Sequence, residues 1–157
     1  MWESLQHAGW VTVISDTGWL YAAVSVIHYF TLFVFIGTVA LLDLRILGIA
    51  DRRQAIMQLA GQILPWNWIV FALAMVSGFV LFATDAVNYV PVGLFQLKLL
   101  VILLALLATI VVQRGLRAWD QSPSVPVGAK IMAFVSLALW IGAILAAVDI
   151  SYIAGVG

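Results

Sequence analysis

The sequence predicts an all-α fold, a four-helix bundle that spans a membrane and has no separate soluble domain. Of the 157 residues, 65% are hydrophobic and only 9% are charged, whereas a soluble domain carries about 25% charged residues. Four stretches are apolar enough, and long enough, to cross a bilayer core about 30 Å thick, which takes about 20 residues of helix. They are residues 19–42, 66–83, 94–112 and 131–153.

Each span has a recognisable boundary. Asp16 or Thr17 can cap the N-terminus of the first span, and Pro65 suits the first turn of the second. The stretch "NYVPVG" (88–93) predicts the turn before the third span. The stretch "DQSPSVPVG" (120–128) predicts the longest loop. The four spans therefore follow one another as crossings of a single membrane domain.

Two further segments are expected to lie along the membrane surface. In residues 51–64 a glutamine recurs at every fourth position with apolar side chains between, which gives a helix one polar stripe. Residues 2–14 are expected to do the same at the opposite face, held by Trp2 and Trp10. An irregular leader held by these tryptophans is the alternative. The stripe consists of Gln54, Gln58 and Gln62.

The basic residues predict the orientation of the chain. Six of the seven Lys and Arg side chains flank the first and third connections between spans. The positive-inside rule places these connections in the cytoplasm, so both termini lie on the periplasmic side of a bacterial inner membrane. The six residues are Arg45, Arg52, Arg53, Arg114, Arg117 and Lys130.

One face of the first span is polar. Tyr21, Ser25, His28, Thr31 and Thr38 are separated by four, three, three and seven residues, so a helix places them on one side. His28 therefore belongs to a polar seam that faces the bundle interior.

Two further spans direct a charge at surfaces suited to helix packing. Lys98 shares a face of the third span with Ala105 and Thr109. Asp149 follows a face of small residues in the fourth span, which suits close approach of another helix. Those small residues are Ala138, Gly142 and Ala146.

The depths of these groups are similar. By helical rise, His28 lies about 13 Å in from Trp19, Lys98 about 6 Å in from Leu94 and Asp149 about 9 Å in from Gly155, all measured from the periplasmic side. A charge at the centre of a membrane helix costs about 2.5–3.5 kcal/mol, which favours pairing. We therefore expect Lys98 and Asp149 to pair, with His28 deeper and linked to them by hydroxyls or water. Asp43 and Arg45 are expected to reach the cytoplasmic headgroups by snorkelling.

Several short motifs carry a resemblance. With His28, the motifs "LLDLRILG" (41–48), "PWNW" (65–68), "SGFVLF" (77–82) and "FQLK" (95–98) resemble a family of small four-helix bacterial membrane proteins of unknown function. The resemblance implies the same four-span fold and no particular activity. More distantly, the chain is similar to membrane cytochrome b561 and copper-resistance membrane proteins, whose haem or metal sites use histidines within the membrane. This chain departs from them because it has one histidine in a span, whereas a bis-histidine haem site needs two.

Three interpretations of His28 remain open. It is a buried group that hydrogen-bonds a neighbouring helix and specifies packing, a proton-handling or solute-contacting group, or a haem ligand. Haem b with His28 and Met75 as its ligands is the cofactor hypothesis, because helical rise puts Met75 about 12 Å in from Ala83, near the depth of His28. For Lys98 and Asp149, the alternatives are a structural ion pair and a gate in a polar cavity that Asp85 and Asn88 would join.

Composition excludes several classes of function. The chain has no cysteine, so thiol catalysis, thiolate zinc sites and iron–sulfur clusters are ruled out. It has no catalytic triad motif, P-loop or dinucleotide fingerprint, no metal-ligand cluster, and no basic face for nucleic acid. The sequence thus favours a non-catalytic membrane protein, as a subunit, an anchor or a small transport component, that contacts lipid and either other subunits or further copies of itself. A haem-b electron carrier that uses His28 is the alternative.

Overall fold

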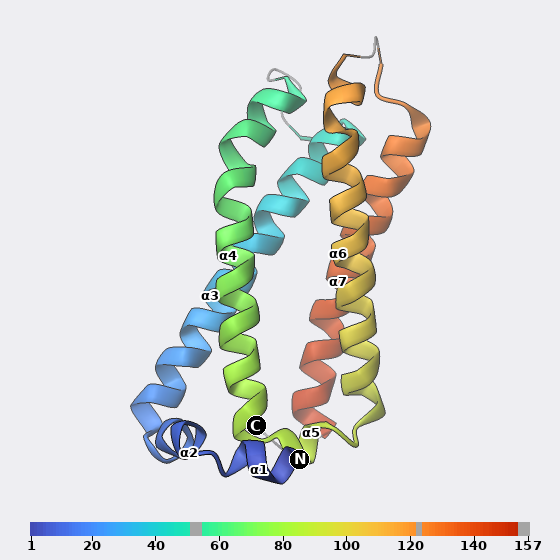
Figure 1. The fold of residues 1–157 in the computed structure, drawn as a ribbon. Helices are drawn as coiled ribbons and strands as arrows, with labels where there is room; N and C mark the ends of the chain where they lie inside the picture. Colours follow the sequence, from blue (N-terminus) through green and yellow to red (C-terminus); the bar gives the residue numbers. More distant parts are fainter. Residues whose placement is uncertain (51–54, 122–123, 154–157) are drawn as a thin grey trace.

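The computed structural model describes residues 1–50, 55–121 and 124–153, with the side chains of all of these up to residue 147. Four long helices run antiparallel in a bundle (Figure 1), as the sequence predicts. They are α3 (Gly18–Leu47), α4 (Ile56–Thr84), α6 (Gly93–Asp120) and α7 (Val127–Ile153). Three short helices, α1 (Trp2–Gln6), α2 (Gly9–Asp16) and α5 (Ala86–Tyr89), lie at the end that carries both termini, here called the terminal end.

The long helices contain the predicted spans and extend beyond most of their ends. They have between 27 and 30 residues, which corresponds to about 40–45 Å of helix against a bilayer core of about 30 Å. In the described part of each helix, length and composition suffice to cross a membrane. The chain is therefore a multi-pass membrane protein.

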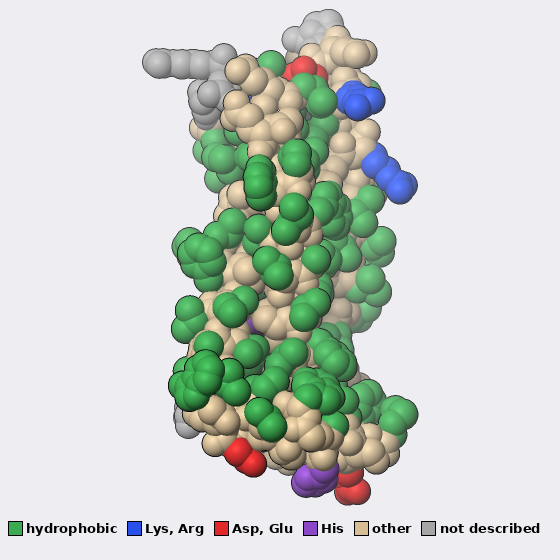
Figure 2. Space-filling view, turned by 60° about the vertical axis from the view of Figure 1, so that its left-hand side comes forward, with side chains coloured by type: hydrophobic (Ala, Val, Ile, Leu, Met, Phe, Trp, Pro, Cys, Tyr) green, Lys and Arg blue, Asp and Glu red, His purple; other side chains and the backbone are tan. Residues whose placement is uncertain are grey.

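The surface of the bundle suits contact with lipid. Large hydrophobic side chains are exposed along all four long helices, for example Phe33 (82% exposed) and Phe134 (62%). Figure 2 shows hydrophobic side chains over the length of one face, with charged side chains gathered towards the two ends. The end opposite the termini carries four of the described basic residues and is called the basic end. They are Arg45, Arg114, Arg117 and Lys130.

The bundle consists of two helix pairs, α3 with α4 and α6 with α7. Helix α3 also packs on α7 and so joins the pairs, whereas α4 and α6 make little contact. One apolar core cluster lies near the basic end and a second lies in the middle of the bundle. Five of the thirteen buried residues in these clusters are alanines, which lets the helices approach closely.

The interfacial segment predicted for residues 51–64 is wrong for its described part. Residues 56–64 belong to α4, which continues through Pro65 in its interior rather than beginning there. The reason is packing, because Ile56 and Ala60 are buried against the other helices in the core cluster at the basic end. Gln58 and Gln62 lie on the exposed side of α4, as the stripe predicts, and Gln54 lies outside the described residues.

The N-terminal segment is helical, so the alternative of an irregular leader is wrong. Val11 of α2 is fully buried, and the Trp2 ring of α1 meets the Phe82 ring edge-on at 5.7 Å. Figure 1 shows α2 almost end-on, lying crosswise to the long helices. These short helices therefore cover part of the terminal end of the bundle.

The motif "LLDLRILG" forms the last turns of α3. Gly48 ends the helix in the left-handed conformation, with φ of 80°. The Gly48 N–H donates to the Arg45 carbonyl and the Ile49 N–H donates to the Leu44 carbonyl. Glycine adopts this conformation without the steric cost that a Cβ brings. The motif thus fixes where the first long helix stops.

Candidate functional site

His28 lies between α3 and α4. Its Nδ1 is 3.0 Å from the Ala74 carbonyl oxygen and 3.2 Å from the Ser77 hydroxyl oxygen. The Ser77 hydroxyl is 2.7 Å from the Leu73 carbonyl, to which it donates. Because the Ala74 carbonyl only accepts hydrogen bonds, a hydrogen on Nδ1 satisfies this geometry, and the neutral ring then presents Nε2 as an acceptor.

Gly78 makes room for the imidazole. A Cβ at this position would lie 2.7 Å from the His28 Cε1 and 3.2 Å from Nδ1, closer than ordinary contact. The "SG" of the motif "SGFVLF" therefore receives His28, since Ser77 supplies a hydroxyl and Gly78 supplies space. The contact between His28 and the Ser77–Gly78 dipeptide was not predicted from the sequence. The signal for it is a histidine in one span and a Ser-Gly dipeptide in the next.

Lys98 lies in the same half of the bundle as His28. It is half-buried and lies five residues after the start of α6, at the terminal end. The Asp149 side chain lies outside the described residues, so its pairing with Lys98 stays a prediction. His28, Ser77 and Lys98 are called the terminal cluster.

The other seam residues lie around this cluster. Thr31 is buried, and its hydroxyl bonds the carbonyls of its own helix, as does the half-buried Ser25 hydroxyl. Tyr21 is 39% exposed and lies near Tyr89. Burial raises the pKa of Tyr89 above its ordinary value, and the neighbouring Tyr21, Asp85 and Tyr29 contribute to the rise.

The corner between α4 and α5 holds the two residues expected at the mouth of a cavity. The Asn88 side-chain amide donates to Asp85 Oδ1 at 2.7 Å. In the small-residue face predicted for α7, Ala138 is exposed, whereas a Cβ on Gly142 would contact Val101 of α6. The buried face of α7 instead contains Ser136 and Trp140, together with Ala129, Ala133 and Ala143.

An aromatic layer crosses the middle of the bundle. Phe35 of α3 is fully buried, with its ring 4.9 Å from that of Phe71 of α4 and 5.0 Å from that of Trp140 of α7. Ala105 of α6 completes the layer within the same core cluster. By helical rise, Phe35 lies about 10 Å from His28 along α3. The layer therefore separates the terminal cluster from the basic end.

A second polar group follows directly on the basic side of this layer. Each long helix places one polar side chain three or four residues from its layer residue, which is one helical turn. The Thr38 hydroxyl donates to Asn67 Oδ1 at 2.6 Å, and the Trp140 indole N–H donates to the Thr109 hydroxyl at 2.9 Å. The Thr109 and Ser136 hydroxyl oxygens are 3.4 Å apart. The basic-end cluster is defined as Asp43 and the four polar residues one turn from the layer: Thr38, Asn67, Thr109 and Ser136.

Asp43 does not reach the headgroups, so its predicted snorkelling is wrong. It is 1% exposed, and its side chain hydrogen-bonds Ser136 of α7. The reason is its position on α3, because Asp43 lies beside Leu42 and Val39 on the face that packs into the bundle. Its second oxygen, Oδ2, is buried without a hydrogen-bond partner among the described residues.

The described residues do not fit a haem held by His28 and Met75. The His28 ring lies against Gly78 and its Nδ1 faces the Ala74 carbonyl, so the space beside α4 is filled by the imidazole itself. Met75 is 37% exposed, and it precedes the buried Ser77 on another side of α4. The two side chains are therefore not presented to a common cleft.

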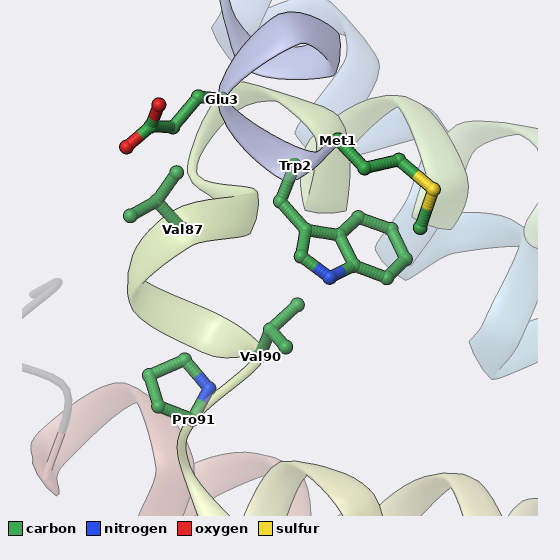
Figure 3. A pocket seen from close by; sticks show the side chains of 6 residues that line it. All are labelled: Met1, Trp2, Glu3, Val87, Val90 and Pro91. Carbon is green, nitrogen blue, oxygen red and sulfur yellow. The ribbon is translucent and has the colours of Figure 1, made fainter.

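The described pockets lie away from these clusters. One, of about 410 Å³, opens at the terminal end between α1 and α5 (Figure 3). Its wall is mainly apolar, with Trp2 over Val90, and the Glu3 carboxylate points outward in the figure. A second, of about 370 Å³, lies between α4 and α6 and is lined in part by Arg114 and Arg117. Neither pocket is lined by a residue of the two clusters. The basic-end cluster is mostly buried between helices, whereas His28 and Lys98 of the terminal cluster are half-buried.

No protein-family model matches the chain, and neither a curated protein nor a solved structure matches it.

Proposed function

We propose that this chain is a non-catalytic bacterial inner-membrane protein that serves as a small transport component and passes a small cation between the two polar clusters. One observation carries the proposal: the terminal cluster and the basic-end cluster lie on either side of the Phe35 aromatic layer, along one helix. Anchors and packing subunits need no such arrangement. Ionisable groups within a membrane bundle commonly belong to ion pathways.

The distances favour a stepwise path. By helical rise, His28 lies about 10 Å from Phe35, and Asp43 lies about 12 Å beyond it. Neither step can be bridged by a single hydrogen bond, so passage requires the aromatic layer to shift or water to enter. A layer of closely packed rings at rest opposes a leak of ions, which a transport component in an energised membrane must avoid.

The orientation proposal rests on charge. The described arginines and lysine outside the terminal cluster gather at the basic end, and the positive-inside rule assigns that end to the cytoplasm. The terminal cluster then belongs to the periplasmic half. Labelling of a single cysteine placed at Gly9 tests this, because a membrane-impermeant thiol reagent added to intact spheroplasts should react there. If Gly9→Cys reacts only after the membrane is disrupted, the orientation is the opposite of the one proposed.

The motifs of the family resemblance also support the proposal. Each of the four motifs contributes one polar or charged residue to the two clusters. These residues are Asp43, Asn67, Ser77 and Lys98. We therefore propose membership of that family of small four-helix bacterial membrane proteins.

We also propose that the protein works with other membrane subunits or as a homo-oligomer, because a bundle this small has an interior filled by its own side chains. The mass of the detergent-solubilised protein, measured by light scattering after gel filtration, distinguishes these cases. A single chain that copurifies with no other protein would contradict both.

Ion flux in proteoliposomes tests the transport proposal. A potassium gradient with valinomycin sets the membrane potential, and entrapped dyes report internal pH and sodium. We expect a cation influx above that of protein-free vesicles, lowered at least about tenfold in His28→Ala. The matched control is His7→Ala, since His7 is exposed on the connection between α1 and α2. Influx of neither cation above the protein-free level would overturn the transport function.

A further inference from the structure

The Asp43 carboxyl group lies in an unusual setting. It is 1% exposed, Ser136 hydrogen-bonds it from α7, and its Oδ2 has no partner among the described residues. Ser136 itself is fully buried. A buried polar atom without a hydrogen bond costs about 1–3 kcal/mol, and more if it is charged. A group of this kind in a packed interior calls for a functional explanation.

No described cation compensates Asp43. Helix α4 carries no charged residue, and Arg114 and Arg117 of α6 and Lys130 of α7 are exposed at the surface. Arg45, on the same helix, is half-buried two residues further on, about 200° around the helix axis.

A buried carboxylate with no cation beside it among the described residues is unstable in its charged form. Transfer of an ionised carboxyl into a low-dielectric interior costs several kcal/mol even after relaxation, so the group either finds a counter-ion or takes up a proton. The Ser136 hydroxyl hydrogen-bonds Asp43, and the buried residues Leu42 and Ile46 on the same helix belong to the apolar core cluster. Neutralisation by a proton removes the larger cost, that of burying the charge, and needs no counter-ion.

We propose that the Asp43 carboxyl is a proton-binding site and that Oδ2 is the atom that takes the proton. This inference deepens the proposed function, on which it rests, by naming the proton as the small cation. The proton exchanges with the bulk from the basic end, from which Asp43 is about 6 Å by the rise of the last turn of α3.

A hydroxyl chain leads from this site towards the aromatic layer. The Ser136 hydroxyl lies between Asp43 and Thr109, with 3.4 Å between the two hydroxyl oxygens. The Thr109 oxygen accepts from the Trp140 indole, whose ring belongs to the layer. Hydroxyls both donate and accept, so they can relay a proton, whereas the indole only donates. The relay therefore ends at Trp140, so at rest the aromatic layer interrupts the proposed proton path at this residue.

Infrared difference spectroscopy between two pH values tests the site in the purified protein, without any transport. We expect the carbonyl-stretch band of a protonated carboxylic acid at neutral pH, shifted by exchange into D₂O and lost at alkaline pH. The band should be absent from Asp43→Asn and retained in the matched control Asp120→Asn, whose side chain still has an oxygen to accept from the Ile56 N–H. In Ser136→Ala, which leaves Asp43 in place, the band should persist at a changed frequency.

Retention of the band in Asp43→Asn, or its absence from the wild type at neutral pH, would overturn the inference. If Asp43→Asn does not fold, the Ser136→Ala variant decides: a carbonyl-stretch band at the wild-type frequency in that variant would also overturn the inference. The two proposals fail separately. Sodium influx without proton influx contradicts the proton inference alone, and a band assigned to Asp43 without any influx contradicts the transport function alone.

Discussion

Gly78→Ala is the sharpest test of how His28 is held. The new Cβ would lie 2.7 Å from His28 Cε1, whereas ordinary contact begins at 3.4 Å, so the ring must retreat by roughly 0.7 Å. The retreat strains the 3.0 Å contact between Nδ1 and the Ala74 carbonyl. Overpacking of this kind costs about 1–3 kcal/mol, against which alanine gains up to about 1 kcal/mol in helix propensity. We expect a net destabilisation of about 0–2 kcal/mol.

Unfolding by SDS in mixed micelles, followed by circular dichroism, measures the change. The matched control is Gly37→Ala in α3, where a Cβ meets nothing within 4 Å and a gain of up to about 1 kcal/mol is expected. In a His28→Ala background the clash disappears, so Gly78→Ala should become neutral or stabilising, with a coupling of about 1–3 kcal/mol. Equal effects of Gly78→Ala with and without His28 would refute the reasoning.

Three further predictions follow from the helix end, the indole and the imidazole. Gly48→Ala should destabilise the protein by about 1 kcal/mol in the same unfolding assay, because φ is 80° there; an unchanged midpoint would contradict the left-handed cap. Trp140→Phe should cost at least about 0.5–1.5 kcal/mol, because the 2.9 Å bond to the Thr109 hydroxyl is lost and the smaller ring leaves part of the buried indole volume unfilled; a wild-type midpoint would show that this bond is absent. Protein purified from haem-replete cells should show no Soret band, because His28 and Met75 face no common cleft, and a band that disappears in Met75→Leu would contradict that geometry.

The fold was predictable from the sequence because a bilayer leaves few solutions. Hydrocarbon offers the backbone no hydrogen bonds, so long apolar stretches must be helices. Helix ends were less predictable. The polar stripe of residues 51–64 resembles an interfacial helix, but Ile56 and Ala60 find apolar partners in the bundle, and tertiary packing extends α4 through Pro65.

The candidate site was predictable in part. Helical spacing places His28 and Thr31 on the inner face of α3, and the structure has both there. The position of Asp43 near a helix end predicts snorkelling to the headgroups, yet its place on the helical wheel, one turn from the buried Val39, predicts burial. Asn67 and Ser136 were missed because small polar residues in apolar spans give no periodic signal of their own. Their spacing of one turn from Phe71 and Trp140 was the pattern that would have revealed them.

The central claim is that the polar side chains near the basic end of α3 face into the bundle, where Asp43 meets Ser136. Cross-linking tests it directly, because the chain contains no cysteine to interfere. Asp43→Cys and Ser136→Cys are introduced together and treated with a short bifunctional thiol reagent, and the digested protein is analysed by mass spectrometry. The control pair is Leu41→Cys with Ser136→Cys, since Leu41 is 42% exposed two residues away.

We predict a linked peptide for the Asp43 pair and little or none for the Leu41 pair. Equal yields, or a link for the Leu41 pair alone, would mean that Asp43 points out of the bundle. The proposed cation path between the two polar clusters would then be wrong.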